Sequence, residues 1–154
     1  MRKLEDAYLH KGLRKQLVDL LRTKGITDEK VLEAIGTIPR HFFLDSAFDR
    51  IAYEDRAFPI AADQTISQPY IVARMVELAI SGARRDKVLE IGGGCGYQTV
   101  VLAQLFKTVY SIERIAQLMD RARLRLRELR INNARLKHGD GFIGIAEAAP
   151  FDVI

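Results

Sequence analysis

Cysteine is nearly absent from this chain of 154 residues, which contains only Cys95. A single thiol cannot form an internal disulfide, and it cannot supply a metal cluster by itself. This scarcity agrees with a reducing compartment and gives little support to metal chemistry. We therefore expect a protein without disulfides and without a bound metal.

Long apolar runs are also missing. No stretch approaches the ~18 apolar residues that cross a bilayer, and residues 1–6 lack the apolar core of a secretory signal. The composition, 48% hydrophobic and 29% charged, is typical of a globular domain rather than a disordered chain. We expect a cytoplasmic protein with no membrane partner.

The net charge of +4 favours acidic partners only in a general way. In residues 114–130 several arginines alternate with other residues, which on a helix scatters their charge around the axis: Arg121, Arg123, Arg125 and Arg127. The apolar residues of this segment recur every three or four positions, as a core-facing stripe requires: Ile115, Leu118, Ala122, Leu126 and Leu129. We interpret the arginines as a solvated helix face and expect no nucleic-acid partner.

The first part of the chain is dominated by helical patterns. Apolar positions follow helical spacing over residues 4–21, and Gly25 supplies a typical helix stop. A second helix should follow with Thr27 as its cap, and Pro39 should end it.

The next segment is expected to be less regular. Residues 39–62 predict short helical pieces in irregular structure, and residues 64–68 predict a loop. Pro69 is suited to the first turn of a helix, which should run to about residue 78. We assign residues 1–80 to an N-terminal helical region.

From Lys87 onward, strands and helices alternate, which is typical of a parallel sheet in an α/β fold. The expected strands are residues 88–91, 109–112, 134–137 and 151–154, and the expected helices are residues 97–105 and 115–129. We predict one structural domain in which residues 81–154 form a Rossmann-like core of about four strands. A buried strand at the last residue would leave an unpaired edge, so we expect the fold to be truncated there.

A glycine-rich segment, EIGGGCG at residues 90–96, lies between a predicted strand and a predicted helix. Glycine lets the backbone turn tightly and approach a ligand without an intervening side chain. Gly92, Gly94 and Gly96 have the spacing G-x-G-x-G rather than the G-x-G-x-x-G of dinucleotide loops. A phosphate-binding P-loop is excluded because no Gly-Lys-Ser/Thr sequence follows.

Acidic residues accompany this loop. Glu90 precedes the glycines and fits a ligand with an amine or sulfonium, while Glu113 ends the second strand, where it can accept hydrogen bonds from ribose hydroxyls. Asp140, followed by Gly141, could accept from an adenine amine after the third strand. Together these residues resemble the Rossmann-like methyltransferases that use S-adenosylmethionine.

Other interpretations of the same residues remain open. A glycine turn can be purely structural, Glu90 can be a helix-cap partner, and Cys95 is a small filler rather than a nucleophile. A nicotinamide-dependent oxidoreductase is a further alternative that depends on the glycine loop alone.

Several segments, in order along nearly the whole chain, resemble the protein-L-isoaspartate O-methyltransferase family: residues 38–43, 52–60, 64–69, 88–92, 109–114, 139–141 and 149–152. The resemblance implies methyl transfer from S-adenosylmethionine to the free carboxyl of L-isoaspartyl residues in damaged proteins, a repair reaction. It implies isoaspartyl proteins and peptides as partners, and it places residues 1–80 on the substrate side.

The resemblance also implies an active-site role for Ser67, with Thr65 and Ile66 lining the same loop. From local sequence alone, Ser67 is better interpreted as the cap of the helix that Pro69 opens. A carboxylate nucleophile with a pKa near ~4 is already ionised at neutral pH, so the reaction needs no strong base. Catalysis would come from alignment of the reacting atoms at about 3 Å, with Ser67 and Thr65 orienting the carboxylate.

Some features depart from the family. Gly93 and Cys95 stand where members more often carry Thr or Ser, and the chain ends where members continue. A non-catalytic, cofactor-binding fragment is therefore an alternative. We interpret His10 and His41 as structural, His138 as a support of the Asp140 turn, and residues 53–56 as a substrate-side wall or a salt-bridged support.

Overall fold

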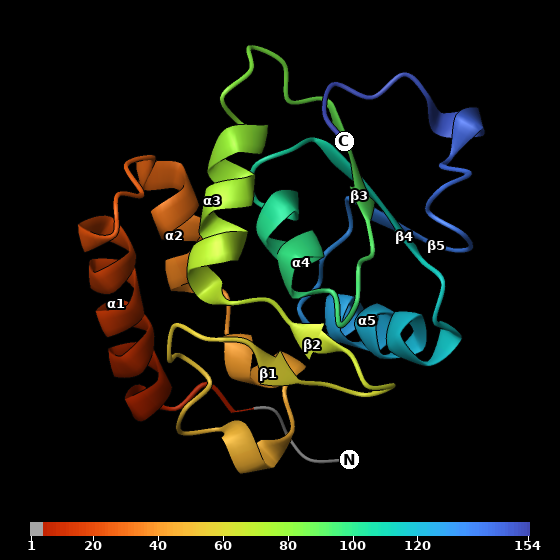
Figure 1. Ribbon diagram of the computed structural model, residues 1–154. Helices are drawn as coiled ribbons and strands as arrows, with labels where there is room; N and C mark the ends of the chain where they lie inside the picture. The colour runs from red at the N-terminus through yellow and green to blue at the C-terminus, as the bar shows by residue number, and fades with distance from the viewer. Residues whose placement is uncertain (1–4) are drawn as a thin grey trace.

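The computed structural model describes residues 5–154 (Figure 1). The N-terminal region contains three α-helices, two short 3₁₀ helices and a two-stranded ribbon: α1 (Tyr8–Thr23), α2 (Glu29–Thr37), η1 (Arg40–Phe43), η2 (Ser46–Phe48), β1 (Phe58–Pro59), β2 (Thr65–Ile66) and α3 (Pro69–Ala79). The predicted helix start at Leu4 lies outside the described residues, and α1 begins at Tyr8.

The second region alternates strands and helices, as predicted: β3 (Lys87–Ile91), α4 (Tyr97–Ala103), β4 (Thr108–Glu113), α5 (Ala116–Glu128), β5 (Ala134–His138) and the 3₁₀ helix η3 (Ala146–Ala148). The strands form a parallel sheet in the order β3-β4-β5. Because parallel strands point the same way, Ile91, Glu113 and His138 end at one edge of the sheet. The α/β fold class is confirmed.

The expected fourth strand is much shorter than predicted. Residues 151–154 make a single parallel bridge, between Val153 and Val88, and Leu89 donates its backbone N–H to the Val153 carbonyl at 3.0 Å. The Asp152 carboxylate accepts from the backbone N–H groups of Asp86 and Lys87 at 2.9 Å each, which anchors this segment beside β3.

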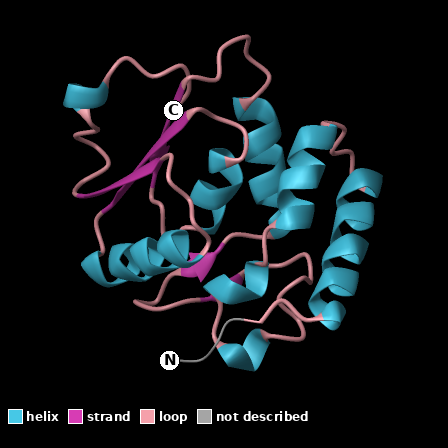
Figure 2. Cartoon of the chain, turned by 180° about the vertical axis from the view of Figure 1, so that it is seen from behind, coloured by secondary structure: helices cyan, strands magenta, loops and turns pink. Residues whose placement is uncertain are grey.

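The two faces of the sheet are covered differently, as alternation along the strands requires. Val88 and Val109 pack in the large core shared with α1 to α4. Leu89 and Ile112 face the opposite way and pack with Ile145 in a smaller cluster. Figures 1 and 2 show helices α1 to α4 on one side of the sheet and the C-terminal segment with η3 on the other. The large core is continuous between the N-terminal helices and α4.

Two local predictions were wrong. The cap of α2 is Asp28 rather than Thr27, because the Asp28 carboxylate reaches the backbone N–H groups of Lys30 at 2.9 Å and Val31 at 3.2 Å. The predicted loop at residues 64–68 contains β2, which pairs antiparallel with β1. None of the helices within residues 5–154 is long and apolar enough to cross a membrane.

Candidate active site

The glycine loop joins β3 to α4 through three left-handed backbone positions. Gly92, Gly94 and Gly96 have φ values of 80°, 55° and 87°, which only glycine adopts at little cost. A Cβ atom at Gly92 or Gly94 would meet no atom within 4 Å, so the backbone there is open to a ligand. Gly96 differs, because its Cβ would lie 3.0 Å from the Ala122 Cβ and 3.1 Å from the Leu126 Cδ1. Its glycine therefore serves close packing of α4 on α5.

Glu113 holds this loop at the end of β4. Its side chain is largely buried, and its two oxygens accept from the backbone N–H groups of Gly94 at 2.9 Å and Ile115 at 2.8 Å. Each oxygen of an ionised carboxylate has a second lone pair, so both can still accept from a hydroxyl of a ligand. The structure thus places Glu113 in direct contact with the glycine loop.

Glu90 lies behind the loop, not in its open face. Its Oε2 accepts from the Thr99 hydroxyl at 2.5 Å and from the Ser111 hydroxyl at 2.7 Å, and the residue is only 6% exposed. Burial raises the pKa of this carboxyl, and the two hydroxyl donors only partly oppose that rise. Glu90 therefore joins β3, β4 and α4 from inside. This placement does not support the expected direct contact of Glu90 with an amine or sulfonium. Glu90 is not a helix-cap partner either, because it accepts from Thr99 within α4.

The departure at Gly93 has a local cause. A Cβ atom there would lie 2.3 Å from the Ser111 Oγ. A serine or threonine at this position would require the Ser111 hydroxyl, which supports Glu90, to move. Ser111 and Thr99 were missed from sequence, although a polar residue on the buried face of an apolar strand was a usable signal.

The turn after β5 is tied to the ends of the other two strands. Gly139 donates its N–H to the Glu113 carbonyl at 3.0 Å, and the His138 Nε2 lies 2.9 Å from the Arg114 carbonyl. A Cβ at Gly141 would lie 2.4 Å from the Ile91 Cγ2, so glycine is required for this approach. The expectation that His138 supports the Asp140 turn agrees with these contacts.

Asp140 itself is exposed at this edge of the sheet. Its Oδ1 accepts from the backbone N–H of Phe142 at 2.9 Å, which closes the turn, and Phe142 is fully exposed. The structure thus brings Gly92, Glu113 and Asp140 to the carboxyl ends of adjacent parallel strands. Ligands of open α/β sheets bind at such an edge.

The segment Thr65–Ser67 presents alternating side chains, with Thr65 and Ser67 exposed and Ile66 buried. The interpretation of Ser67 as the helix cap is wrong. Gln68 occupies the N-cap position of α3, but its side chain makes no capping hydrogen bond. The first free N–H, that of Tyr70, instead donates to the Asp55 carboxylate at 2.8 Å. The Ser67 hydroxyl is therefore not needed for the helix end.

Asp55 also accepts from Lys24 Nζ at 2.5 Å and from Gln68 Nε2 at 3.1 Å. Burial opposes its ionisation, but these hydrogen bonds outweigh burial and lower the pKa of the carboxyl. Residues 53–56 were expected to form either a substrate-side wall or a salt-bridged support. Asp55 has the second role, because it pairs with Lys24.

Arg40 is a residue that the sequence analysis did not single out. It is 0% exposed, and its Nη2 donates to the Ser67 carbonyl at 2.8 Å. Its guanidinium carbon lies 4.9 Å from the centroid of the Tyr97 ring, at the start of α4. No local pattern distinguishes this arginine from a surface residue, so its position follows only from tertiary structure.

A cavity of about 970 Å³ lies between η1, η2 and α5. It reaches the glycine loop at Cys95, but it does not include Glu113, Asp140, Thr65 or Ser67. Burial raises the pKa of the Cys95 thiol to about 11, so the group is protonated at neutral pH. This supports the interpretation of Cys95 as a filler rather than a nucleophile.

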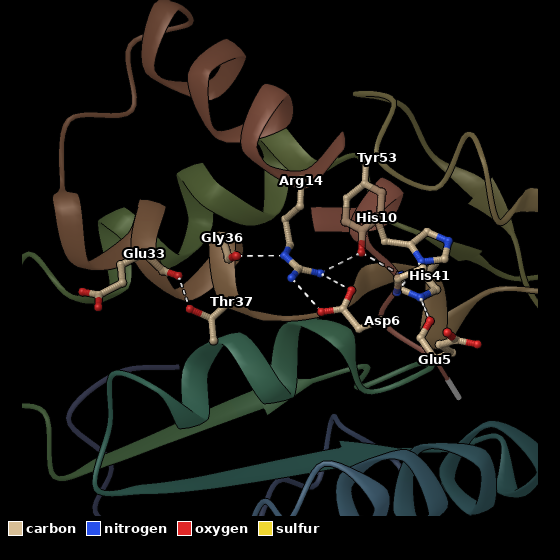
Figure 3. A network of polar contacts seen from close by, with 10 residues as sticks. Glu5, Asp6, His10, Arg14, Glu33, Gly36, Thr37, His41 and Tyr53 are labelled. Atoms are coloured by element: carbon tan, nitrogen blue, oxygen red, sulfur yellow. Dashed lines mark hydrogen bonds and ion pairs between the residues drawn. The ribbon is translucent and has the colours of Figure 1, made fainter. Parts of the chain in front are cut away.

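Figure 3 shows a polar network beside this cavity. Asp6, His10 and His41 lie close enough to suggest a metal site, with their candidate ligand atoms within 4.8 Å of one another. The Asp6 oxygens, however, accept from Arg14 at 3.0 and 2.9 Å. The two histidine rings stack at 3.7 Å between centroids.

The histidine nitrogens of this network also have partners. The His41 nitrogens contact the Tyr53 hydroxyl at 2.7 Å and the Glu5 carbonyl at 3.2 Å. In His10, Nδ1 accepts from the Ala7 N–H at 3.2 Å. Because these lone pairs and protons are already used within the protein, we interpret His10 and His41 as structural, in agreement with the sequence analysis.

The fold and the edge of the sheet described above are those of a Rossmann-like α/β protein, with a ligand site expected at the carboxyl ends of its strands. A solved protein-L-isoaspartate O-methyltransferase superposes on this chain with a TM-score of 0.81 at 30% identity, covering 91% of this chain and 46% of its own. A Plasmodium falciparum structure named for the same activity, in complex with S-adenosyl-L-homocysteine, superposes with a TM-score of 0.73 over 91% of this chain and 71% of its own. At 22% identity it supports the fold alone.

The family model for Protein-L-isoaspartate(D-aspartate) O-methyltransferase matches residues 12–154. Protein-L-isoaspartate O-methyltransferase 2 of Nitrosospira multiformis is 56% identical over 141 residues, which is 92% of this chain and 67% of the relative. The Burkholderia lata relative is 54% identical over 142 residues, which is 92% of this chain and 46% of the relative. The chain belongs to the protein-L-isoaspartate(D-aspartate) O-methyltransferase family. It spans about half the length of the Burkholderia relatives it matches.

Proposed function

We propose that this protein transfers a methyl group from S-adenosylmethionine to the free carboxyl of L-isoaspartyl residues in damaged proteins. The observation that carries the proposal is the contact between Glu113 and the open glycine loop, at the edge of the sheet that also presents Asp140. Membership of a family of O-methyltransferases supports the same cofactor.

The residues at this edge fit the chemistry of that cofactor. Glu113 offers its remaining lone pairs to two ribose hydroxyls, and Asp140 offers an exposed carboxylate to the adenine amine. Gly92 and Gly94 leave open backbone for the amino-acid part. Glu90 supports the loop from behind through Ser111 and Thr99 rather than by contact with the ligand.

When bound, S-adenosylmethionine supplies an electrophilic methyl group on a sulfonium. The protein has to orient the isoaspartyl carboxylate, and the exposed hydroxyls of Thr65 and Ser67 are the donors we assign to that task. A carboxylate with a pKa near ~4 is ionised at neutral pH, so no residue has to remove a proton. Ile66, which lies between these two residues, is buried and leaves both hydroxyl-bearing residues exposed.

The direct test is calorimetric titration of the 154-residue chain with S-adenosylhomocysteine, followed by methyl transfer to an isoaspartyl peptide. We expect binding, weakened about tenfold or more by Asp140→Ala, since a hydrogen bond to a charged group contributes about 1.5–3 kcal/mol. Asp120→Ala, an exposed aspartate on α5, is the matched control and should bind as the wild type does.

Two results would count against the proposal. Binding of NAD but not of S-adenosylhomocysteine would support the alternative of a nicotinamide-dependent oxidoreductase. Binding of S-adenosylhomocysteine without methyl transfer to any isoaspartyl peptide would contradict the proposed activity and would support the non-catalytic, cofactor-binding alternative.

We also propose isoaspartyl proteins and peptides as the partners of this site and the cytoplasm as its location. The single cysteine supports a reducing compartment. Fractionation of cells that express the tagged protein would test the location.

A further inference from the structure

Arg40 is a buried cation that the proposed chemistry does not use. Its Nε donates to the Ala52 carbonyl at 3.0 Å and its Nη2 to the Ser67 carbonyl at 2.8 Å. The Nη2 also lies 3.5 Å from the Arg56 carbonyl. Among the described residues, its hydrogen-bond partners are thus backbone carbonyls, not carboxylates. Burial lowers the pKa of the guanidinium, although the nearby Tyr97 and Cys95 side chains oppose this effect.

The burial of Arg40 has a cost in stability. A buried charge without a carboxylate partner is costly, and a buried donor without an acceptor adds to that cost. The Arg40 Nη1 and the Tyr97 hydroxyl are both buried without a hydrogen-bond partner in the part of the chain that is described. Buried groups of this kind need an explanation, and one such explanation is a role in function.

The two ends of this contact belong to the two halves of the proposed site. Ser67 lies in the segment assigned to the isoaspartyl carboxylate. Tyr97 is the first residue of α4 and follows Gly96, which ends the glycine loop. The guanidinium therefore lies between the substrate segment and the residue that follows the cofactor loop. It donates a hydrogen bond to the Ser67 carbonyl, and its central carbon lies over the Tyr97 ring.

A second contact connects Tyr97 to the helix η1 that contains Arg40. The Tyr97 ring, 2% exposed, packs edge-on against Phe43 at 5.4 Å between centroids, and Phe43 is in the same 3₁₀ helix as Arg40. A movement of the glycine loop is thus expected to move Tyr97, η1 and the Ser67 backbone together. Methyl transfer depends on alignment of the reacting atoms, and a displacement of about 1 Å can cost about a hundredfold in rate.

We propose that Arg40 is a positioning residue that couples the cofactor loop to the substrate segment. Through Tyr97 and the Ser67 carbonyl, binding of S-adenosylhomocysteine orders residues 64–68, and Arg40 transmits the effect without touching either ligand. This inference rests on the proposed function for the roles of the two segments. The coupling itself is measurable without catalysis.

The test is amide hydrogen exchange of the full 154-residue chain, with and without S-adenosylhomocysteine, in the wild type and in Arg40→Lys. Lysine keeps the charge but lacks the planar fork that reaches the Ala52 and Ser67 carbonyls while its carbon lies over the Tyr97 ring. We expect the ligand to slow exchange in residues 64–68 about fivefold or more in the wild type, and Arg40→Lys to lose this protection. Arg50→Lys, an exposed arginine of the same region, is the matched control and should keep it.

The proposal is overturned if the wild type shows no ligand-dependent protection in residues 64–68, or if Arg40→Lys retains it. It is also overturned if protection falls equally in α1, because that pattern reports general destabilisation. If Arg40→Lys does not fold, Tyr97→Leu replaces it, since this variant removes the ring but leaves the hydrogen bond to Ser67. The same loss of coupling is expected.

Methyl transfer by the same samples separates this inference from the proposed function. Ligand-dependent protection lost in Arg40→Lys, but no methylation by the wild type, contradicts only the proposed function. Methylation by the wild type without the exchange difference contradicts only the role of Arg40. If both hold, Arg40→Lys should lower kcat for an isoaspartyl peptide about tenfold or more, while the Kd for S-adenosylhomocysteine changes less than about threefold.

Discussion

Glu90 shows how burial alters the chemistry of a single side chain. Its carboxyl is enclosed between β3, β4 and α4, and two hydroxyl groups donate to one of its oxygens. Burial raises its pKa above the ordinary value of 4.5, so the folded protein binds this proton more tightly than the unfolded chain does. Stability from this group is fully present below pH 4.5 and is lost as the pH rises through the folded pKa.

Glu90→Gln should remove this dependence. The free energy of unfolding of the wild type is expected to fall with rising pH above 4.5, by at most about 1.4 kcal/mol per pH unit for one proton. The variant should lack this component of the slope, because the amide does not ionise. Urea denaturation at several pH values measures it, with exposed Glu33→Gln as the control. Equal slopes in the wild type and Glu90→Gln would contradict the prediction.

Gly96→Ala tests close packing and backbone conformation together. The residue has a φ of 87°, and an added Cβ would meet Ala122 and Leu126 on α5 at 3.0–3.1 Å. We expect a loss of roughly 2–4 kcal/mol in the free energy of unfolding. Gly12→Ala is the control, because Gly12 lies within α1 with open space at the Cβ, and alanine there should stabilise by about 0.5–1 kcal/mol. A neutral Gly96→Ala would show that α5 yields easily.

At the scale of elements, the helix ends are held by carboxylates from other segments. The Glu77 carboxylate of α3 accepts from the N–H groups of Thr27 and Asp28 at the start of α2, at 2.8 and 2.9 Å. Asp55 does the same for Tyr70 at the start of α3. A negative group at a helix N-terminus is favourable both for its hydrogen bonds and for the helix dipole. These contacts join α2, α3 and the irregular segment into one unit.

Asp55→Ala should therefore destabilise the protein by about 1–2 kcal/mol at neutral pH, the usual cost of a lost cap. The lowered pKa of Asp55 means that its contribution persists above the ordinary value of 3.8 and is lost as the pH falls through the folded pKa. The difference between wild type and variant should accordingly vanish in strong acid. Chemical denaturation at neutral and acidic pH measures this, with exposed Asp19→Ala as the matched control. A difference that persists in acid would show that the carboxylate is not its cause.

For the whole molecule, the network in Figure 3 connects the start of the chain to the region before the sheet. The Tyr53 hydroxyl accepts from Arg14 at 3.1 Å and contacts the His41 Nδ1 at 2.7 Å. Burial raises the pKa of Tyr53 to about 12, so the phenol keeps its proton and can donate it to His41. Burial also lowers the His41 pKa, which agrees with a neutral ring in this role.

Tyr53→Phe should cost about 1–3 kcal/mol in the free energy of unfolding, because it leaves buried polar groups of Arg14 and His41 without this partner. Tyr110→Phe is the control, since the Tyr110 ring packs edge-on against Phe151 and the substitution keeps that packing. Thermal and urea denaturation of both variants give the comparison. Equal stability of the two would mean that the network adds little to the fold.

Much of the molecule was predictable because it depends on neighbouring residues. The alternation of strands and helices from β3 to β5 follows from the apolar periodicity of the sequence. The glycines at positions 92, 94 and 96 mark the turn between β3 and α4, where the structure has positive φ angles. The placement of Glu113 and Asp140 at one edge follows from parallel strands. At Ser67 the prediction failed because Asp55, twelve positions upstream in the sequence, accepts the hydrogen bond at the start of α3. At α2 the cap is the neighbouring Asp28 rather than Thr27.

The sequence by itself determined the family, the fold class and the acidic residues at the edge of the sheet, because all three depend on short segments in a fixed order. Tertiary structure alone decided which way Glu90 faces and what Arg40 joins. Arg40 and Ser67 are 27 residues apart, and Glu90 and Ser111 are 21 apart. Contacts at such separations are selected by the packing of whole elements around a shared core, and no local pattern of residues contains that information.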